Sequence, residues 1–208
     1  MPNGYLQAGQ NIGDQTEDNT TVALNVNGKL NVAGGKRIIS NVPIGSIALA
    51  SMGTSTTGVV AKSFITDIFV PHNRVLSTFA VLSGAADTNN WTAAIYDSFG
   101  TLIATGIAAG VVIATVDVWQ TQAVAFVYPK NTAGTPTAVA ATSVQLHGPQ
   151  QYFIAIHVSN TTGTIQTLPS PYIDLCTQNP TDTFGTFPTS ITPPTTFTTN
   201  IAPIVYIA

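Results

Sequence analysis

The sequence predicts an all-β protein: an antiparallel β-sandwich or jelly roll preceded by an extended N-terminal arm with a β-hairpin. Three observations predict this class. Short alternating apolar segments recur from residue 38 onward, turn residues separate them, and helical periodicity is weak throughout the 208 residues. We therefore divide the chain into an arm over residues 1–40 and a sandwich body over residues 41–208.

The arm differs from the rest of the chain in composition. Residues 1–21 are rich in Gly, Gln and Asn and show little periodicity, which is typical of an extended segment. Asn27-Gly28 then separates two alternating apolar stretches, residues 22–26 and 29–32. Because both positions of a tight hairpin turn need positive φ, Asn-Gly in this setting predicts a β-hairpin.

The body consists of candidate strands bounded by Pro, Gly, Asn and Asp. Each strand is a short apolar or alternating run rich in β-branched and aromatic residues. The strands are expected at residues 38–42, 44–50, 59–69, 74–83, 91–96, 102–105, 118–127, 152–158, 164–168, 172–176 and 201–207.

Two long loops rich in Pro and Thr interrupt the strands, at residues 129–141 and 179–199. Loops of this length usually make functional contacts or become ordered on a partner. The second loop carries apolar side chains that we expect to be exposed, at Phe184, Phe187, Ile191 and Phe197. The residues expected to bind partners are Leu24, Lys29, Lys36 and Arg37 in the arm, and Phe184, Phe187 and Phe197 in this loop.

Charge is scarce: 7% of the residues are charged, the formal net charge is −3, and no Lys or Arg follows Lys130. Such a surface packs against neighbours with little charge desolvation, which favours a place in an assembly. Without a basic patch, we expect no nucleic-acid partner. No apolar run reaches the length of a membrane helix, so no membrane partner is expected. Residues 1–10 resemble no signal peptide, so export through the standard route is not expected.

The residues that carry chemistry form no recognisable site. His72, His147 and His157 lack metal-ligand spacing, and His157 is expected on the outer face of its strand. The nine carboxylates are scattered, and no nucleophile or phosphate-binding motif is present. We therefore expect no enzyme activity, metal or cofactor.

Cys176, Trp91 and Trp119 are each expected to pack inside the body. Cys176 is the single cysteine and is expected to be a small buried apolar residue. Trp91 and Trp119 lie on alternating strands and are expected in the core, although exposed aromatic rings in some sandwiches stack on sugars.

Residues about 64–168 contain two motifs of note: Tyr96-Asp97-Ser98-Phe99-Gly100 after an alternating strand, and Gly148-Pro149-Gln150-Gln151-Tyr152-Phe153-Ile154-Ala155. With these motifs the region resembles a β-sandwich module that recurs in virion proteins of tailed bacteriophages. The resemblance implies a structural component of the virion, made in the host cytoplasm. The arm lies outside it.

The leading expectation is a capsid decoration, or cement, protein on the outer capsid surface. Its partners would be the major capsid protein and copies of itself, as a homotrimer. The alternative is a tail, fibre or head-surface module that binds a host glycan. A third hypothesis, a polysaccharide-degrading tail enzyme, needs a carboxylate cluster that the sequence does not mark.

Overall fold

The computed structural model describes residues 38–42, 49–57, 62–86, 88–129, 137–169, 175–180 and 183–208. The chain divides into two compact units, Met1–Gly35 and Lys36–Ala208. The first unit, which contains the predicted hairpin, lies outside the described residues. The boundary expected at residue 40 stays a prediction, and the fold below is that of the second unit.

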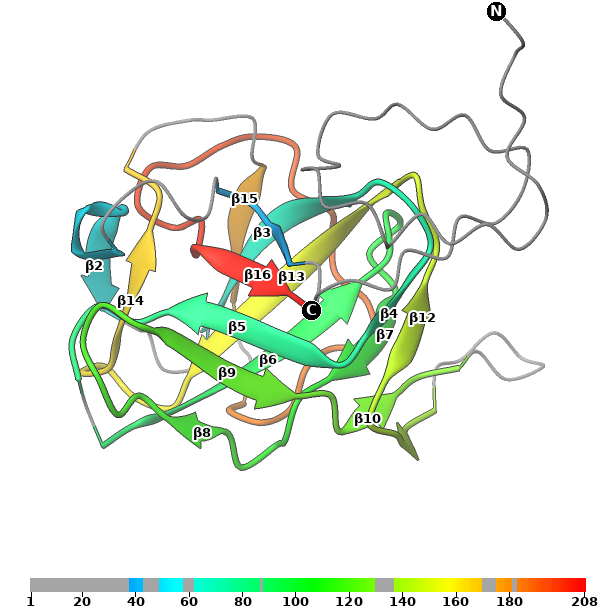
Figure 1. The fold of residues 1–208 in the computed structure, drawn as a ribbon, viewed down its shortest axis with the longest axis horizontal. Helices are drawn as coiled ribbons and strands as arrows, with labels where there is room; N and C mark the ends of the chain where they lie inside the picture. The colour runs from blue at the N-terminus through cyan, green and yellow to red at the C-terminus, as the bar shows by residue number, and fades with distance from the viewer. Residues whose placement is uncertain are drawn as a thin grey trace, which may run out of the picture. The chain divides into compact units, whose positions relative to one another are not determined.

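The second unit is an antiparallel β-sandwich, as the sequence predicts. Its small sheet has the order β1 (Ile39–Ser40), β16 (Val205–Ile207), β5 (Thr78–Leu82), β9 (Trp119–Ala123). Its large sheet has the order β11 (Val139–Ala140), β10 (Phe126–Val127), β7 (Leu102–Thr105), β6 (Asn90–Tyr96), β13 (Gln150–Val158), β3 (Lys62–Val70), β15 (Cys176–Pro180) (Figure 1). A further strand, β8 (Val111–Val112), also pairs with β6.

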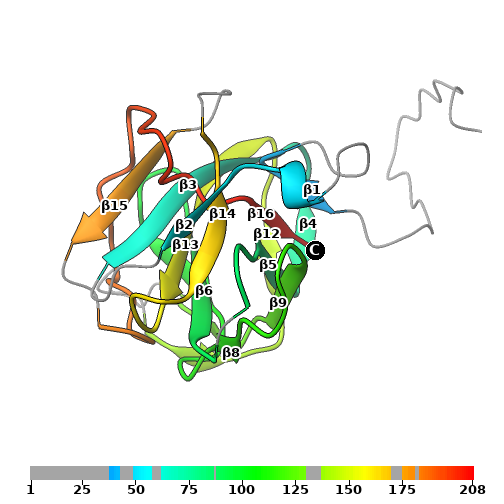
Figure 2. The same cartoon turned by 90° about the vertical axis from the view of Figure 1, so that its left-hand side faces the viewer.

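Two smaller sheets complete the unit: β12 (Val144–Leu146) with β4 (Arg74–Leu76), and β14 (Thr164–Thr167) with β2 (Thr54–Thr57). A short 3₁₀ helix, Leu49–Ser51, precedes β2. Figure 2 shows β5, β9 and β16 of the small sheet on one side and β3 and β13 of the large sheet on the other. Every strand pair in the described part is antiparallel.

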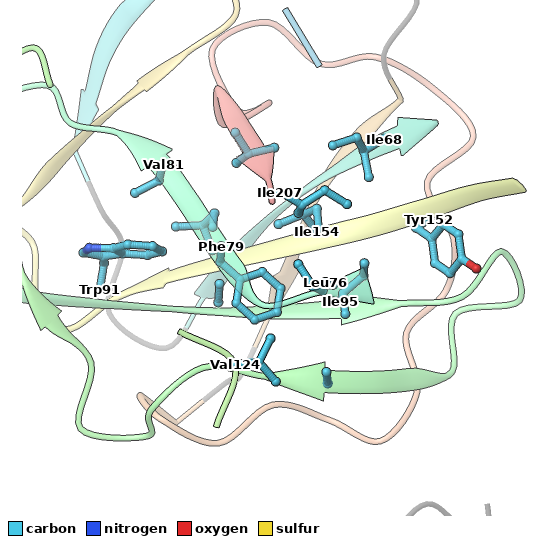
Figure 3. Packing of buried hydrophobic residues seen from close by; sticks show 14 of the residues in the cluster. Ile68, Leu76, Phe79, Val81, Trp91, Ile95, Val124, Tyr152, Ile154 and Ile207 are labelled. Carbon is cyan, nitrogen blue, oxygen red and sulfur yellow. The ribbon is translucent and has the colours of Figure 1, made fainter. Parts of the chain in front are cut away.

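The main core lies between the two principal sheets. Because successive strand side chains point to opposite faces, alternate residues of each strand enter this layer. Phe79 and Val81 of β5 meet Ile95 of β6 and Ile154 of β13, and all four are buried (Figure 3). Trp91 is also fully buried in this cluster, as expected from its strand position.

Two segments expected to be single strands change sheets instead. Residues 74–83 form β4 and then β5, and residues 118–127 form β9 in the small sheet and then β10 in the large sheet. Alternating polarity shows which residues of a strand face the core. Because both sheets face the same core, a chain that crosses from one sheet to the other keeps the same alternation. The pattern therefore does not mark the crossing at Ser77.

Other boundaries also differ from expectation. The sequence does not predict β2, β8 or β12, and β11 lies in a stretch expected to be a loop. Within the expected strand at residues 44–50, the described end belongs to the 3₁₀ helix. Where a strand is expected at residues 172–176, β15 begins at Cys176. Residues 43–48 and 171–174 lie outside the described part.

A buried glutamine bridges a gap in the pairing of β6. β6 pairs with β8 at its start and with β7 from Ala94 onward, so Ala93 lies between these two partners. The Gln122 side chain reaches this point from β9 and is 2% exposed. Its Oε1 accepts the Ala93 N–H at 3.2 Å, and its Nε2 donates to the Ile107 carbonyl at 3.2 Å.

Replacing Gln122 by leucine is expected to lower the free energy of unfolding by about 1–3 kcal/mol, because the Ala93 N–H loses its acceptor inside the protein. Urea denaturation measures this loss. The matched control is Gln145→Leu on β12, where the side chain is exposed and the expected loss is under about 0.5 kcal/mol. Equal losses in the two variants would contradict a special role for Gln122.

Candidate interaction site

The 183–191 segment lies over the outer face of the large sheet, which is the face turned away from the small sheet. The Leu102 N–H donates to the Thr189 carbonyl at 3.0 Å, and the Tyr96 hydroxyl donates to the Pro188 carbonyl at 3.0 Å. These bonds join the segment to β6 and β7. Much of the loop expected to meet a partner is therefore bound to the chain's own sheet.

The apolar side chains of this segment were expected to be exposed, but the structure places them against the sheet. Phe187 and Ile191 are 8% and 9% exposed and pack in a second core on the outer face of the large sheet, with Phe153 of β13 among their neighbours. Phe184 is half-buried. The expectation of exposure is wrong because these apolar side chains cover sheet residues that would otherwise face water.

His157 lies beneath this segment. It is on the face of β13 turned away from the main core, as expected, but it is fully buried. Its ring contacts Phe184 and Phe187 in edge-on geometry, with centroids 5.4 Å and 6.2 Å away. The histidine is therefore part of the packing between the 183–191 segment and the sheet.

The remaining residues predicted to bind partners divide into two groups. Phe197 is half-buried and packs against a third core that contains Cys176 and Ile204. The four arm residues, Leu24, Lys29, Lys36 and Arg37, lie outside the described residues.

Cys176 is buried, as expected, and its Sγ exchanges hydrogen bonds with the backbone of Thr198.

Phe99 is the most exposed large apolar side chain of the described part, at 83%. It lies on the turn between β6 and β7. One Asp97 carboxylate oxygen accepts the N–H groups of Phe99 at 2.9 Å and Thr101 at 2.8 Å. Gly100 has φ of 81°, and a Cβ there would lie 2.1 Å from the Ile191 carbonyl oxygen. This turn, residues 97–101, is fixed in place and presents the Phe99 ring to solvent.

Phe69, which is 59% exposed, lies at the same end of the large sheet as this turn. β3 ends where β13 begins, with Phe69 opposite Gln151, and β6 also ends here. The Gln150 amide donates to the Ser98 hydroxyl at 3.1 Å, which joins the start of β13 to the turn. We call Phe69 and Phe99, with the exposed His72 and His147 of the neighbouring loops, the aromatic end.

The described surface is almost free of charge. In that part of the chain the charged side chains are Lys62, Asp67, Arg74, Asp97 and Asp117, and each is half-buried. None of the exposed side chains in this part of the chain therefore belongs to Asp, Glu, Lys or Arg.

The described carboxylates serve the chain's own structure. Asp67 accepts the Leu175 N–H at 2.7 Å and the Gln151 amide at 2.6 Å. Burial raises the pKa of the Asp67 carboxyl, and these hydrogen bonds oppose the shift. Asp117 accepts the Gln166 amide at 3.0 Å, and Asp97 shapes the turn that holds Phe99.

Trp119 is half-buried and packs edge-on against Tyr206, with ring centroids 4.8 Å apart. Within the described ranges, no three His, Cys, Asp or Glu side chains gather where they could hold a metal ion. The same ranges contain no helix with the length and apolarity needed to cross a membrane.

Comparison with known proteins gives no match: no family model, curated protein or solved structure is significantly similar to this chain. The candidate site therefore depends on the geometry alone.

Phe99 is not among the residues predicted to bind partners, although the sequence around it indicates its exposure. In Asp97-Ser98-Phe99-Gly100, the phenylalanine occupies the centre of a tight turn between two paired strands. A side chain at a turn centre lies beyond the sheet and has few neighbours from its own chain. An aromatic residue at this position is therefore expected to be exposed to solvent.

Proposed function

We propose that this protein is a structural component of a phage virion, a capsid decoration protein that binds the major capsid protein and stabilises the head. The surface carries the proposal: within the described residues no exposed side chain belongs to Asp, Glu, Lys or Arg, and the most exposed large apolar side chain, Phe99, lies on a fixed turn. A surface with few charges joins an assembly with little charge desolvation, and rigid aromatic residues are common anchors of interfaces.

In this proposal the aromatic end faces the capsid. Phe99 enters an apolar depression on the major capsid protein, and Phe69 extends the contact. Further copies of the chain associate as a trimer on the outer capsid surface, and the arm residues Lys29, Lys36 and Arg37 add attachment. The Phe187 side chain holds the 183–191 segment on the sheet and makes no partner contact.

The test uses capsids assembled from the major capsid protein encoded with this chain. Capsids carrying the wild-type chain are expected to open at a higher temperature than bare capsids, as followed by light scattering and calorimetry. Phe99→Glu is expected to weaken capsid binding at least tenfold, because it would bury an unpaired carboxylate. Thr161→Glu, on another exposed turn, is the matched control and is expected to bind like wild type.

Unchanged capsid stability with the chain bound at saturation would contradict the cement role. Wild-type binding by Phe99→Glu would contradict the proposed orientation.

A second candidate is recognition of a host glycan by the aromatic end. The observation in its favour is that Phe69 and Phe99 share one end of the sheet with the exposed rings of His72 and His147. Aromatic rings in such a cluster can stack on sugar faces. Glycan-array binding that Phe99→Ala abolishes, by a chain that does not bind capsids, would favour this candidate.

A further inference from the structure

Within the described residues, β9 lies at the edge of the small sheet and pairs only with β5. Val81 and Phe79 of β5 lie opposite Gln120 and Gln122 of β9. The Val124 N–H also donates a hydrogen bond to the carbonyl of Ser77, the residue directly before β5. The even-numbered residues of β9 therefore direct their backbone groups toward β5, since ladder hydrogen bonds alternate along an antiparallel strand.

The odd-numbered residues of β9 direct their N–H and C=O groups away from the sheet. Thr121 and Ala123 are exposed, and Trp119 is half-buried. No backbone hydrogen bond to these outward groups is present in the described part of the chain. Among the described residues, these three N–H groups and three C=O groups therefore have no backbone partner along the edge.

This edge lacks the usual protection against pairing. Natural edge strands are commonly short, or carry a charge, a proline or a bulge. β9 is five residues long, reads Trp-Gln-Thr-Gln-Ala, and pairs with β5 in an unbroken register. The other edges of the two principal sheets are shorter or contain proline: β1 and β11 have two residues each, and β15 ends at Pro180.

The sequence of β9 is compatible with pairing to itself. In an antiparallel pair centred on Thr121, this residue lies opposite Thr121 of the partner subunit, and Trp119 lies opposite Ala123 of the partner subunit. The large tryptophan side chain then lies opposite the small alanine side chain, the two threonines lie opposite each other, and no like charges face each other. This register places odd-numbered residues of one strand opposite odd-numbered residues of the other. Since these are the residues whose N–H and C=O groups point outward, each outward group gains a hydrogen-bond partner.

We propose that β9 pairs with β9 of a second copy about a two-fold axis at Thr121, which joins the small sheets of two subunits into one continuous sheet. Such an isologous contact closes on itself and therefore links the subunits in pairs. The β9–β9 contact uses a different surface from the aromatic end. A variant can therefore lose the β9–β9 contact and still bind capsids, or lose capsid binding and still form the β9–β9 contact. The proposed trimer would be a separate contact between subunits.

Cysteine cross-linking tests both the contact and its register. Opposite Cα atoms in a hydrogen-bonded antiparallel pair are about 5.5 Å apart, within the range of about 4.4–6.8 Å that a disulfide spans. The full chain carrying Thr121→Cys, oxidised with glutathione disulfide, is expected to form a covalent dimer at least tenfold faster than Thr161→Cys. The native Cys176 is buried and hydrogen-bonded, so the added thiol is the reactive one.

Ala123→Cys is the register control. Two copies of residue 123 would lie about four residues apart along the pair, roughly 13 Å, and are expected to cross-link as slowly as the Thr161→Cys control. Equal rates for Thr121→Cys and Thr161→Cys would overturn the proposal. Faster cross-linking of Ala123→Cys than of Thr121→Cys would overturn the register.

Charge exchange provides a second readout that needs no covalent bond. Thr121→Lys and Thr121→Glu each place like charges opposite one another and are expected to lose the two-fold contact, seen as a lower mass by light scattering. An equimolar mixture of the two is expected to regain the wild-type mass. Wild-type association by both single variants, or a wild-type chain that stays monomeric at high concentration, would overturn the proposal.

Discussion

Replacing Trp91 by alanine is expected to lower the free energy of unfolding by about 3–5 kcal/mol. Trp91 is the largest of the fully buried side chains and lies in the main core between the two sheets. Its removal leaves a cavity that the surrounding strands, held by hydrogen bonds on both sides of β6, fill only in part. Urea denaturation followed by circular dichroism measures the loss.

The other tryptophan supplies a matched control. Trp119 is half-buried at the sheet edge, where it packs against Tyr206. Trp119→Ala removes the same side chain but a smaller buried area, so the expected loss is about 1–2 kcal/mol. A Trp119 loss as large as that of Trp91 would show that the main core is not where the structure places it.

Replacing Phe187 by alanine is expected to lower the free energy of unfolding by about 3 kcal/mol. The ring is 8% exposed and packs over the outer face of the large sheet beside His157. Phe99→Ala is the matched control: its ring is 83% exposed, so the expected change in stability is under about 0.5 kcal/mol.

The two alanine variants are therefore expected to affect different properties, one the folding stability and the other the capsid binding. Phe187→Ala should destabilise the chain, whereas Phe99→Ala should keep its stability and weaken capsid binding. If Phe187→Ala kept wild-type stability and lost capsid binding, the exposed loop expected from the sequence would be the better description.

Much of the sandwich could be predicted from local patterns. Alternating or apolar runs bounded by turns locate β6, β7 and β13 closely, because each remains in one sheet from end to end. The pattern does not reveal that the chain changes sheets between β4 and β5, since inward-facing residues stay inward-facing across the change. β2 is also missed, because Thr-Ser-Thr-Thr has no apolar alternation and pairs with β14 at the margin of the sandwich.

The burial of the 183–191 segment was less predictable for a physical reason. Phe184, Phe187 and Ile191 belong to a segment without regular secondary structure, so no periodicity indicates which side chains are buried. Their burial depends on a sheet face formed by residues far away in sequence, including Ile65 and Phe153. Phe99, by contrast, could be recognised from local turn chemistry, because its exposure follows from four consecutive residues.

The proposed function places this sparsely charged sandwich on the outside of a phage head, with its aromatic end against the shell. A cryo-electron microscopy reconstruction of the virion that carries this chain tests it most directly. The predicted result is density for the sandwich on the outer capsid surface, with the 97–101 turn in contact with the major capsid protein. Density on the tail, or a head-bound sandwich whose Phe99 points to solvent, would contradict this placement.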